Sequence, residues 1–335
     1  MFLFVTSDTI GSGTGGGIVT KYEMEALNEL GPTDIFNPPA QANPFDTELG
    51  QETIDVRKYK LAHFYAGTFP RLVERLRNAG VKVTYTAAAH DIKDSQDEFK
   101  SIGASYDYPH ITNPDLFKLY LSSYLNADLI ICPSKHSETV MRSYGSSNVR
   151  VIPHGCEPGR NIPYPKTFNV GYLGQIGPDK GVVYLIKAWA KLNYKDAILT
   201  IAGSQSPSLI HHIRAFGGNA NYNVLGYVQT LDMFFSEIKL YVQPSVTEGF
   251  GIEVLESMAY GRPVIATTGV GASDCLNHHC RLIEKRDITA LADAIDYYRN
   301  ISYDYRNDLI NHAQTYNWPY IKSLYKSTWT ELLKS

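Results

Sequence analysis

The chain has 335 residues, of which 44% are hydrophobic and 19% are charged, and its formal net charge is −3. This length and composition are typical of a globular protein with two domains, and they exclude a disordered or fibrous protein. A general nucleic-acid-binding protein usually carries a large basic excess, so the near-neutral charge predicts no nucleic-acid partner.

Signals for membrane insertion and for secretion are both weak. No stretch approaches 18 consecutive apolar residues, so we expect no transmembrane segment. The first residues, MFLFVTSD, lack the basic region of a typical signal peptide. Four cysteines are too few for a disulfide scaffold. They predict reduced thiols in a cytoplasmic protein.

The first half of the chain alternates short apolar runs with amphipathic stretches. We predict strands at residues 1–6, 81–87 and 128–132, and helices at residues 18–30, 69–78, 116–125 and 137–143. Strands separated by helices of about 10–15 residues are typical of βαβ units, which build a parallel sheet.

The alternation restarts after residues 155–165, a stretch rich in glycine and proline that we interpret as an interdomain linker. Further strands are predicted at residues 169–174, 198–202, 240–243 and 263–267, and helices at residues 182–192, 253–260 and 288–299. The final segment, 318–333, has apolar residues at helical spacing, so it needs a partner surface. Two successive α/β sheets are the expected architecture.

A glycine-rich loop, GSGTGGG at residues 11–17, lies between a predicted strand and a predicted helix. It contains a G-x-G-x-x-G pattern, and glycines before a helix N-terminus allow close approach to a phosphate. A dinucleotide site also needs an acidic residue at the end of the second strand, whereas Asp34 precedes the apolar pair that follows it. An NAD-dependent oxidoreductase and a plain flexible loop both stay open as alternatives.

The most specific signal is the string QPSVTEGFGIEVLESMAYGRPVIAT, residues 243–267. Glu248 and Glu256 are separated by seven residues, and a carboxylate accepts hydrogen bonds from paired hydroxyls such as those of a sugar or a ribose. Gly249 and Gly251 expose backbone N–H groups at the start of a helix, where negative charge is favoured. Two glutamates alone would also fit a solvated helix cap, so the specificity lies in the whole string.

This string resembles the E-x7-E signature of retaining glycosyltransferases with the GT-B fold, of the family 4 type. Five other segments resemble that family in the same order: ADLIICPS at 127–134, VIPHG at 151–155, GYLGQIGPDKG at 171–181, LTIAG at 199–203 and VLGYV at 224–228. The resemblance is strong over residues 127–300 and weaker before them.

The resemblance implies an α/β protein with the GT-B fold, in which two Rossmann-like doubly wound parallel-sheet domains face a cleft. Residues 1–155 would form the acceptor domain and residues 156–315 the donor domain, and a C-terminal helix at 316–335 would cross back to the first domain. The implied reaction transfers a sugar from a UDP- or GDP-sugar to a carbohydrate, lipid-linked or other hydroxyl acceptor. It would retain the anomeric configuration and use neither a metal ion nor a cofactor.

The resemblance also implies roles for the residues that match its motifs. Glu248 would contact hydroxyls of the donor sugar, Glu256 would bind the ribose, and Lys180 would neutralise the diphosphate leaving group. The implied donor-binding set is completed by Gly16, Gly17, Gln175, Val228, Gly249, Phe250, Gly251 and Ile252.

A histidine after the predicted strand 81–87 completes the candidate catalytic set. The family often places a histidine beside the sugar, and His90 occupies the matching position, although a plain loop histidine is the alternative. The candidate catalytic residues are therefore His90, Lys180 and Glu248.

One departure from the family pattern concerns the diphosphate site. The family usually has an arginine five residues before the lysine, where this chain has Gln175, which donates hydrogen bonds but carries no charge. A catalytically inactive nucleotide-sugar-binding homologue therefore stays open.

A metal site is not predicted. The cluster CLNHHC at residues 275–280 lacks the paired ligand spacing of a zinc site, and the sequence contains no D-x-D pair.

Overall fold

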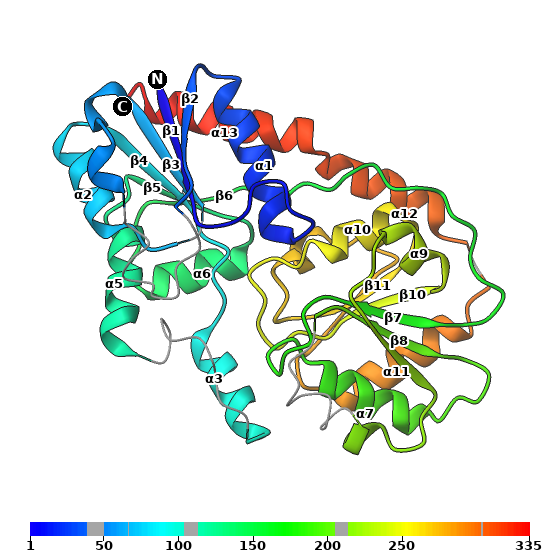
Figure 1. Cartoon of the computed structure of the whole chain (residues 1–335). Coiled ribbons are helices and arrows are strands. Elements are labelled where there is room, and N and C mark those ends of the chain that lie inside the picture. Colours follow the sequence, from blue (N-terminus) through cyan, green and yellow to red (C-terminus); the bar gives the residue numbers. More distant parts are fainter. Residues whose placement is uncertain (39–49, 66, 104–112, 205–213, 303) are drawn as a thin grey trace. The chain divides into compact units, whose positions relative to one another are not determined.

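The computed structural model describes residues 1–38, 50–65, 67–103, 113–204, 214–302 and 304–335 (Figure 1). The chain divides into two compact units. The first consists of Met1–Ala89, Asp107–Gly155 and Trp318–Ser335, and the second of His90–Tyr106 and Cys156–Asn317. Each unit is built around a six-stranded parallel sheet, which confirms the predicted α/β class.

The first sheet has the strand order β2-β1-β3-β4-β5-β6. Its strands are β1 (Phe2–Thr6), β2 (Thr33–Phe36), β3 (Leu61–Tyr65), β4 (Lys82–Thr86), β5 (Leu129–Cys132) and β6 (Val149–Val151). The unit also contains the helices α1 (Gly15–Asn28), α2 (Pro70–Asn78), α5 (Pro114–Leu125), α6 (Lys135–Ser143) and α13 (Trp318–Leu332), and the 3-10 turns η2 (Gln51–Thr53) and η3 (Val56–Lys58). Strands β1, β3 and β5 are buried along their whole length, as expected for parallel strands covered on both faces.

The terminal helix α13 packs beside α1 in the first unit (Figure 1). It buries Ile321, Tyr325 and Trp329, which are three of the residues on the predicted apolar stripe. Beneath them the imidazole Nε2 of His63 lies 3.0 Å from Oε2 of Glu23, and Oε1 of Glu23 accepts a 2.6 Å hydrogen bond from the Tyr325 hydroxyl. This buried network links α13 to α1 and β3, because the buried Tyr325 hydroxyl reaches the Glu23 carboxylate only when the helix is docked.

The second sheet has the order β12-β11-β10-β7-β8-β9. Its strands are β7 (Val170–Leu173), β8 (Leu199–Ala202), β9 (Tyr222–Gly226), β10 (Leu240–Gln243), β11 (Val264–Thr267) and β12 (Arg281–Ile283). The unit contains α3 (Ile92–Ser101), α7 (Val182–Leu192), α9 (Leu231–Ser236), α10 (Glu253–Ala259), α11 (Ile288–Arg299) and α12 (Arg306–Ala313), with the 3-10 turns η4 (Gly271–Cys275) and η5 (Gln314–Tyr316). Trp189 and Ile295 fill the core between this sheet, α7 and α11.

The order of the second sheet reverses between β7 and β10. Strands β7, β8 and β9 follow one another in one direction, and β10 then pairs with the opposite side of β7. The loops that leave β7 and β10 therefore lie next to each other at the carboxyl edge of the sheet, where the strand order reverses. Ligands of open parallel sheets bind at such a switch point.

One segment lies in a different unit from the one expected. Residues 1–155 were all expected in the first domain, but the segment His90–Tyr106, which is described over residues 90–103, belongs to the second unit. The side chains that pair α3 with the second unit are charged, so the sequence shows no apolar periodicity that would predict this attachment. The terminal helix also begins at Trp318, two residues later than the predicted boundary at 316.

No helix within the described ranges combines the length and the apolar character needed to cross a bilayer.

Replacing Trp329 by alanine should lower the free energy of unfolding of the first unit by about 3–5 kcal/mol, because the fully buried indole leaves a cavity against His63. Tyr320 lies in the same helix and is 51% exposed, so Tyr320→Ala should change stability by less than about 0.5 kcal/mol. Urea unfolding followed by circular dichroism measures both variants. Equal losses would show that α13 is not docked through its apolar face.

Candidate functional site

An ion pair between Lys180 and Glu248 lies at the switch point of the second sheet. Lys180 is in the loop between β7 and α7, and Glu248 is in the loop between β10 and α10. The ammonium of Lys180 donates a 2.6 Å hydrogen bond to Oε2 of Glu248. The two side chains are 21% and 19% exposed, so the pair is screened from most solvent but can be reached from outside.

Main-chain hydrogen bonds fix the loops that carry this pair. The N–H of Val246 donates to the carbonyl of Asp179 over 2.8 Å, and the N–H of Glu248 donates to the carbonyl of Gly269 over 2.8 Å. Gly181 has φ of +68°, and the Pro244 carbonyl occupies the space that a Cβ atom would need there. Glycine at 181 thus allows the β7 loop to contact the β10 loop directly.

The charges around Lys180 keep it protonated. Burial alone would lower the pKa of the ammonium, but the neighbouring carboxylates of Glu248 and Asp179 outweigh it and raise the pKa above its usual value. Burial raises the pKa of Asp179, and the nearby charge of Lys180 opposes that shift. The site therefore presents a cation held between two acidic groups.

Two further glutamates project from α10, one turn apart. Burial, followed by repulsion from Glu248, raises the pKa of Glu253 to about 7. Burial, followed by repulsion from Glu253, raises the pKa of Glu256 to about 8. Carboxyl groups with such values are partly neutral near physiological pH, so they can donate as well as accept hydrogen bonds.

Gln175 lies in the same loop as Lys180, directly after β7. The side chain of Gln175 is exposed, and the backbone carbonyl of Gln175 accepts a 2.8 Å hydrogen bond from the hydroxyl of Tyr172. The preceding Gly174 donates to the carbonyl of Ala202 over 3.0 Å, and a Cβ atom on Gly203 would collide with the Gly174 carbonyl. The β7 loop therefore runs close against the end of β8.

The remaining candidates of the second unit surround the Glu248 loop or follow β9. Gly251 has φ of +85°, and a Cβ atom there would lie 3.3 Å from Cγ of Glu248. Phe250 is buried, and its carbonyl accepts a 2.7 Å hydrogen bond from the N–H of Ala272. Gly249 and Ile252 are also buried, and Val228 is half-buried in the loop between β9 and α9.

The candidate glycines of the other half belong to the first unit. Gly16 and Gly17 form the first turn of α1, which Thr14 caps by accepting a 3.1 Å hydrogen bond from the N–H of Gly17. A Cβ atom on Gly16 would collide with the carboxylate of Asp8, so a larger residue there would require the Asp8 side chain to move. The glycine-rich loop therefore lies against the carboxyl group of Asp8, and burial raises the pKa of that group.

The dinucleotide alternative gains no support from this unit. In the first sheet, β1 lies between β2 and β3. In the usual dinucleotide-binding fold, the first strand lies between the second and the fourth strands. Asp34, the candidate ribose ligand, accepts a 2.8 Å hydrogen bond from the hydroxyl of Tyr59.

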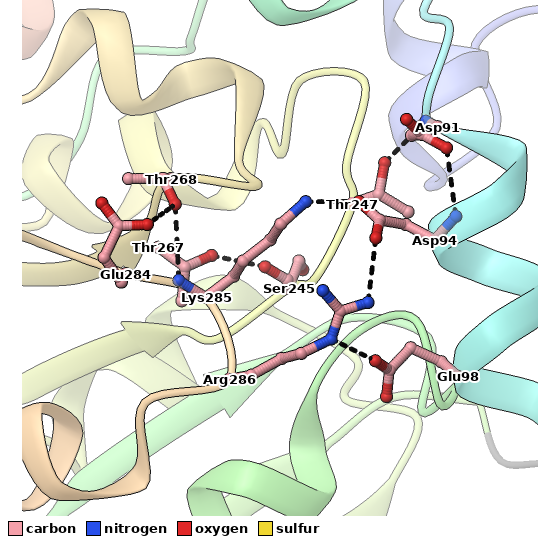
Figure 2. Close-up of polar contacts among 10 residues, drawn as sticks. All are labelled: Asp91, Asp94, Glu98, Ser245, Thr247, Thr267, Thr268, Glu284, Lys285 and Arg286. Atoms are coloured by element: carbon pink, nitrogen blue, oxygen red, sulfur yellow. Dashed lines mark hydrogen bonds and ion pairs between the residues drawn. The ribbon is translucent and has the colours of Figure 1, made fainter. Parts of the chain in front are cut away.

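His90 belongs to the second unit and is half-buried. The next residue, Asp91, donates its backbone N–H to the Thr247 hydroxyl over 2.7 Å (Figure 2). Thr247 immediately precedes Glu248. The structure therefore brings the neighbours of His90 and Glu248 into contact, although the two residues are 158 positions apart in the sequence.

The cluster at 275–280 has the contacts of a packed loop. Burial raises the pKa of the thiols of Cys275 and Cys280 to about 12, so both are protonated at neutral pH. His279 Nε2 lies 3.1 Å from a carboxylate oxygen of Asp308. Across the described ranges, no group of three or more His, Cys, Asp or Glu side chains is placed to hold a metal ion.

Sequence reasoning missed several residues around this site. Glu253 lies inside the recognised string but was assigned no role, and Thr247 was treated as part of the string alone. The charged residues Asp94 and Arg286 pair with each other over 2.9 Å, from segments far apart in the sequence. Only a comparison of related sequences could have signalled that pairing before the structure was known.

Comparison with known proteins identifies the domain that carries the ion pair. Residues 159–316 match the family model described as glycosyl transferases group 1. The O-antigen biosynthesis glycosyltransferase WclY of Escherichia coli is 24% identical over 191 residues, which is 53% of this chain and 54% of that protein. The D-inositol 3-phosphate glycosyltransferase of Pseudarthrobacter chlorophenolicus is 31% identical over 135 residues, 37% of this chain and 30% of that protein. The chain thus spans about half the length, or less, of these curated relatives.

Solved structures with similar folds cover the whole chain. Sucrose-phosphate synthase from Thermosynechococcus elongatus has a TM-score of 0.76 at 18% identity and covers 100% of this chain and 99% of its own. Anabaena HepE in complex with UDP-glucose has a TM-score of 0.72 at 17% identity, covering 99% and 100%. At such identities the likeness concerns the fold. The chain has the GT-B fold of two Rossmann-like units, and its residues 159–316 match the family model of glycosyl transferases group 1.

Proposed function

We propose that this chain transfers a sugar from a UDP- or GDP-sugar to an acceptor hydroxyl, with retention of the anomeric configuration and without a metal ion. The observation that carries the proposal is the Lys180–Glu248 ion pair at the switch point of the second sheet. A cation and a carboxylate held together match the two ends of a sugar diphosphate, which are an anionic leaving group and a set of hydroxyls. The solved complex of HepE with UDP-glucose supports this class of donor.

Lys180 would act on the leaving group. As the bond from the anomeric carbon to the phosphate oxygen breaks, negative charge grows on the diphosphate, and a fixed ammonium lowers the energy of that charge. A diphosphate competes with Glu248 for Lys180, so donor binding would free the carboxylate to accept hydrogen bonds from the sugar. The departing phosphate oxygen would take the proton of the acceptor hydroxyl, and His90 would lie beside the sugar.

Glu256 would bind the ribose of the nucleotide. Because the pKa of Glu256 is about 8, its carboxyl group is largely protonated at pH 7 before a ligand binds. A protonated carboxyl group can donate one hydrogen bond to a ribose hydroxyl while its carbonyl oxygen accepts another. Gly249, Phe250 and Gly251 would hold the sugar and the phosphates through backbone groups.

A second function is favoured by one observation. Gln175 is exposed in the loop of Lys180, where the family pattern expects an arginine, so the diphosphate meets one charged side chain fewer. A protein that binds nucleotide sugars without turning them over has this feature. Incubation with UDP- and GDP-sugars, scored for donor hydrolysis and for thermal stabilisation by free nucleotide, separates the two functions. Binding without turnover favours the second function. Absence of both hydrolysis and stabilisation contradicts both functions.

Lys180→Ala should reduce the turnover of the sugar nucleotide by about 10²- to 10³-fold, as expected for loss of one donor to a developing anion. The fold should survive, because the residue lies on a loop. Lys191→Ala is the matched control, since Lys191 is an exposed lysine of the same unit whose ammonium contacts Thr289. Full activity of Lys180→Ala would contradict the leaving-group role.

Glu256→Ala and Glu248→Gln should affect different parts of the donor. Glu256→Ala should weaken binding of both the free nucleotide and the nucleotide sugar, by about 0.5–1.5 kcal/mol for each hydrogen bond of an uncharged carboxyl group. Glu248→Gln should lower turnover without weakening free-nucleotide affinity, because it removes the carboxylate that competes with the diphosphate for Lys180. Calorimetric titration with the nucleotide, with and without its sugar, measures the difference. The assignments fail when the two variants change both affinities alike.

The raised pKa of Glu256 predicts a pH-dependent stability. Its value of about 8 in the folded chain exceeds the usual 4.5, so folding favours the protonated form. The contribution of this group is complete below about pH 4.5 and is lost as pH rises towards 8. Glu256→Gln should therefore gain stability relative to the unchanged chain between pH 5 and pH 8, measured as urea midpoints. Glu237→Gln changes an exposed glutamate of the same unit and controls for composition, and a gain that is independent of pH would rule out this assignment.

A further inference from the structure

Helix α3 is attached to the second unit by a cluster of ion pairs. Arg286, in the loop after β12, donates from Nη2 to Asp94 over 2.9 Å and from Nε to Glu98 over 2.6 Å (Figure 2). The adjacent Lys285 pairs with the same Asp94. Glu98 also accepts a 3.0 Å hydrogen bond from the hydroxyl of Tyr184 on α7. We call these contacts of Asp94 and Glu98 the α3 clamp.

The first residue before α3 is held as well. Asp91 caps the helix by accepting a 3.0 Å hydrogen bond from the N–H of Asp94, and its own N–H donates to the hydroxyl of Thr247 over 2.7 Å. Figure 2 shows both contacts at the end of α3 that faces Thr247. Thr247 directly precedes Glu248, so the N-terminus of the clamped helix lies against the loop of the candidate catalytic carboxylate.

The backbone conformation of Arg286 indicates that the contacts of the clamp hold this residue in one position. Its φ of +69° lies in the left-handed region, which a residue with a Cβ atom adopts at a conformational cost. Such strain persists where surrounding contacts fix the residue, and here those contacts are its bonds to Asp94 and Glu98. The Glu98 side chain is 7% exposed, so its charge depends on Arg286 for compensation.

His90 lies between two fixed points of the chain. On one side, the Ala89 carbonyl accepts a 2.7 Å hydrogen bond from the hydroxyl of Ser137 within the first unit. On the other side, Asp91 is bonded to Thr247 within the second unit. Within the second unit, the residue after His90 is therefore bonded to the residue before Glu248, at the end of the helix that the clamp attaches.

We infer that the α3 clamp positions His90 for the reaction, so that Arg286, Lys285 and Thr247 are positioning residues although they need not touch the donor. This inference rests on the proposed function. A helix that only added stability could be attached anywhere on the unit, whereas the N-cap residue of α3 bonds to the residue before Glu248. Displacing a reacting group by about 1 Å can cost about 100-fold in rate, so a clamp at this point acts on turnover.

The test compares Arg286→Gln with Arg299→Gln in the full chain. Arg299 also pairs with a carboxylate of the second unit, Asp196, but has no bond to α3, so it is the matched control. Arg286→Gln should lower kcat for the sugar nucleotide by about 10- to 100-fold while its KM changes by less than about twofold, because a misplaced group affects the transition state more than binding. Amide hydrogen exchange should rise over residues 90–103. Arg299→Gln should change neither.

A double variant separates positioning from stability. Arg286→Gln leaves the buried charge of Glu98 uncompensated, so adding Glu98→Gln should restore the melting temperature. Turnover should stay low, because the clamp is still absent. Recovery of turnover together with stability would overturn the inference.

A second cycle tests whether His90 is the group that is positioned. His90→Ala should lower kcat in the unchanged chain and in Arg299→Gln by the same factor, but by less than about threefold in Arg286→Gln, where His90 is already displaced. Equal factors in all three backgrounds, no effect of His90→Ala, or unchanged kcat in Arg286→Gln would each overturn the inference. Absence of turnover by the unchanged chain with any UDP- or GDP-sugar contradicts instead the proposed function on which the inference rests.

Discussion

The ion pair of Lys180 with Glu248 is the interaction on which the candidate site of the second unit depends. It joins the loops of two strands that are neighbours in the sheet but distant in the chain, at the point where the strand order reverses. Gly181 and the main-chain bonds of Asp179 bring those loops together, so the backbone is organised before the charges meet. A pair held in this way costs little reorganisation when a ligand replaces one partner.

The charges around this pair are unbalanced in favour of the carboxyl groups. One ammonium faces Glu248 and Asp179, while Glu253 and Glu256 follow on α10, and repulsion among them contributes to the raised pKa values of 7 and 8. A protein that needed only stability would replace such groups by apolar ones. The arrangement is instead suited to a ligand that brings both anionic oxygens and hydroxyl groups, because each would satisfy a different member of the set.

The sequence predicts well those helices and strands whose residue pattern is contained in one continuous segment. The apolar spacing of residues 318–333 predicted α13, which spans Trp318–Leu332, and the string from 243 to 267 predicted a strand, a glycine turn and a helix that are all present. Strand β3 was missed because His63 interrupts its apolar run, and the partners of that histidine include Glu23 from α1 and Thr84 from β4. The clamp of α3 could not be predicted, because ion pairs between residues about 190 positions apart follow no period.

The clamp also bears on the missing arginine at position 175. A basic residue elsewhere could have replaced that charge, and Lys285 and Arg286 are two cations of the same unit. Both are paired with carboxylates of α3, so recruiting either one to a phosphate would release Asp94 or Glu98. Holding α3 and supplying a second cation to the diphosphate therefore compete for the same side chains. The geometry favours the first use, which leaves Lys180, the exposed amide of Gln175 and backbone N–H groups to meet the diphosphate.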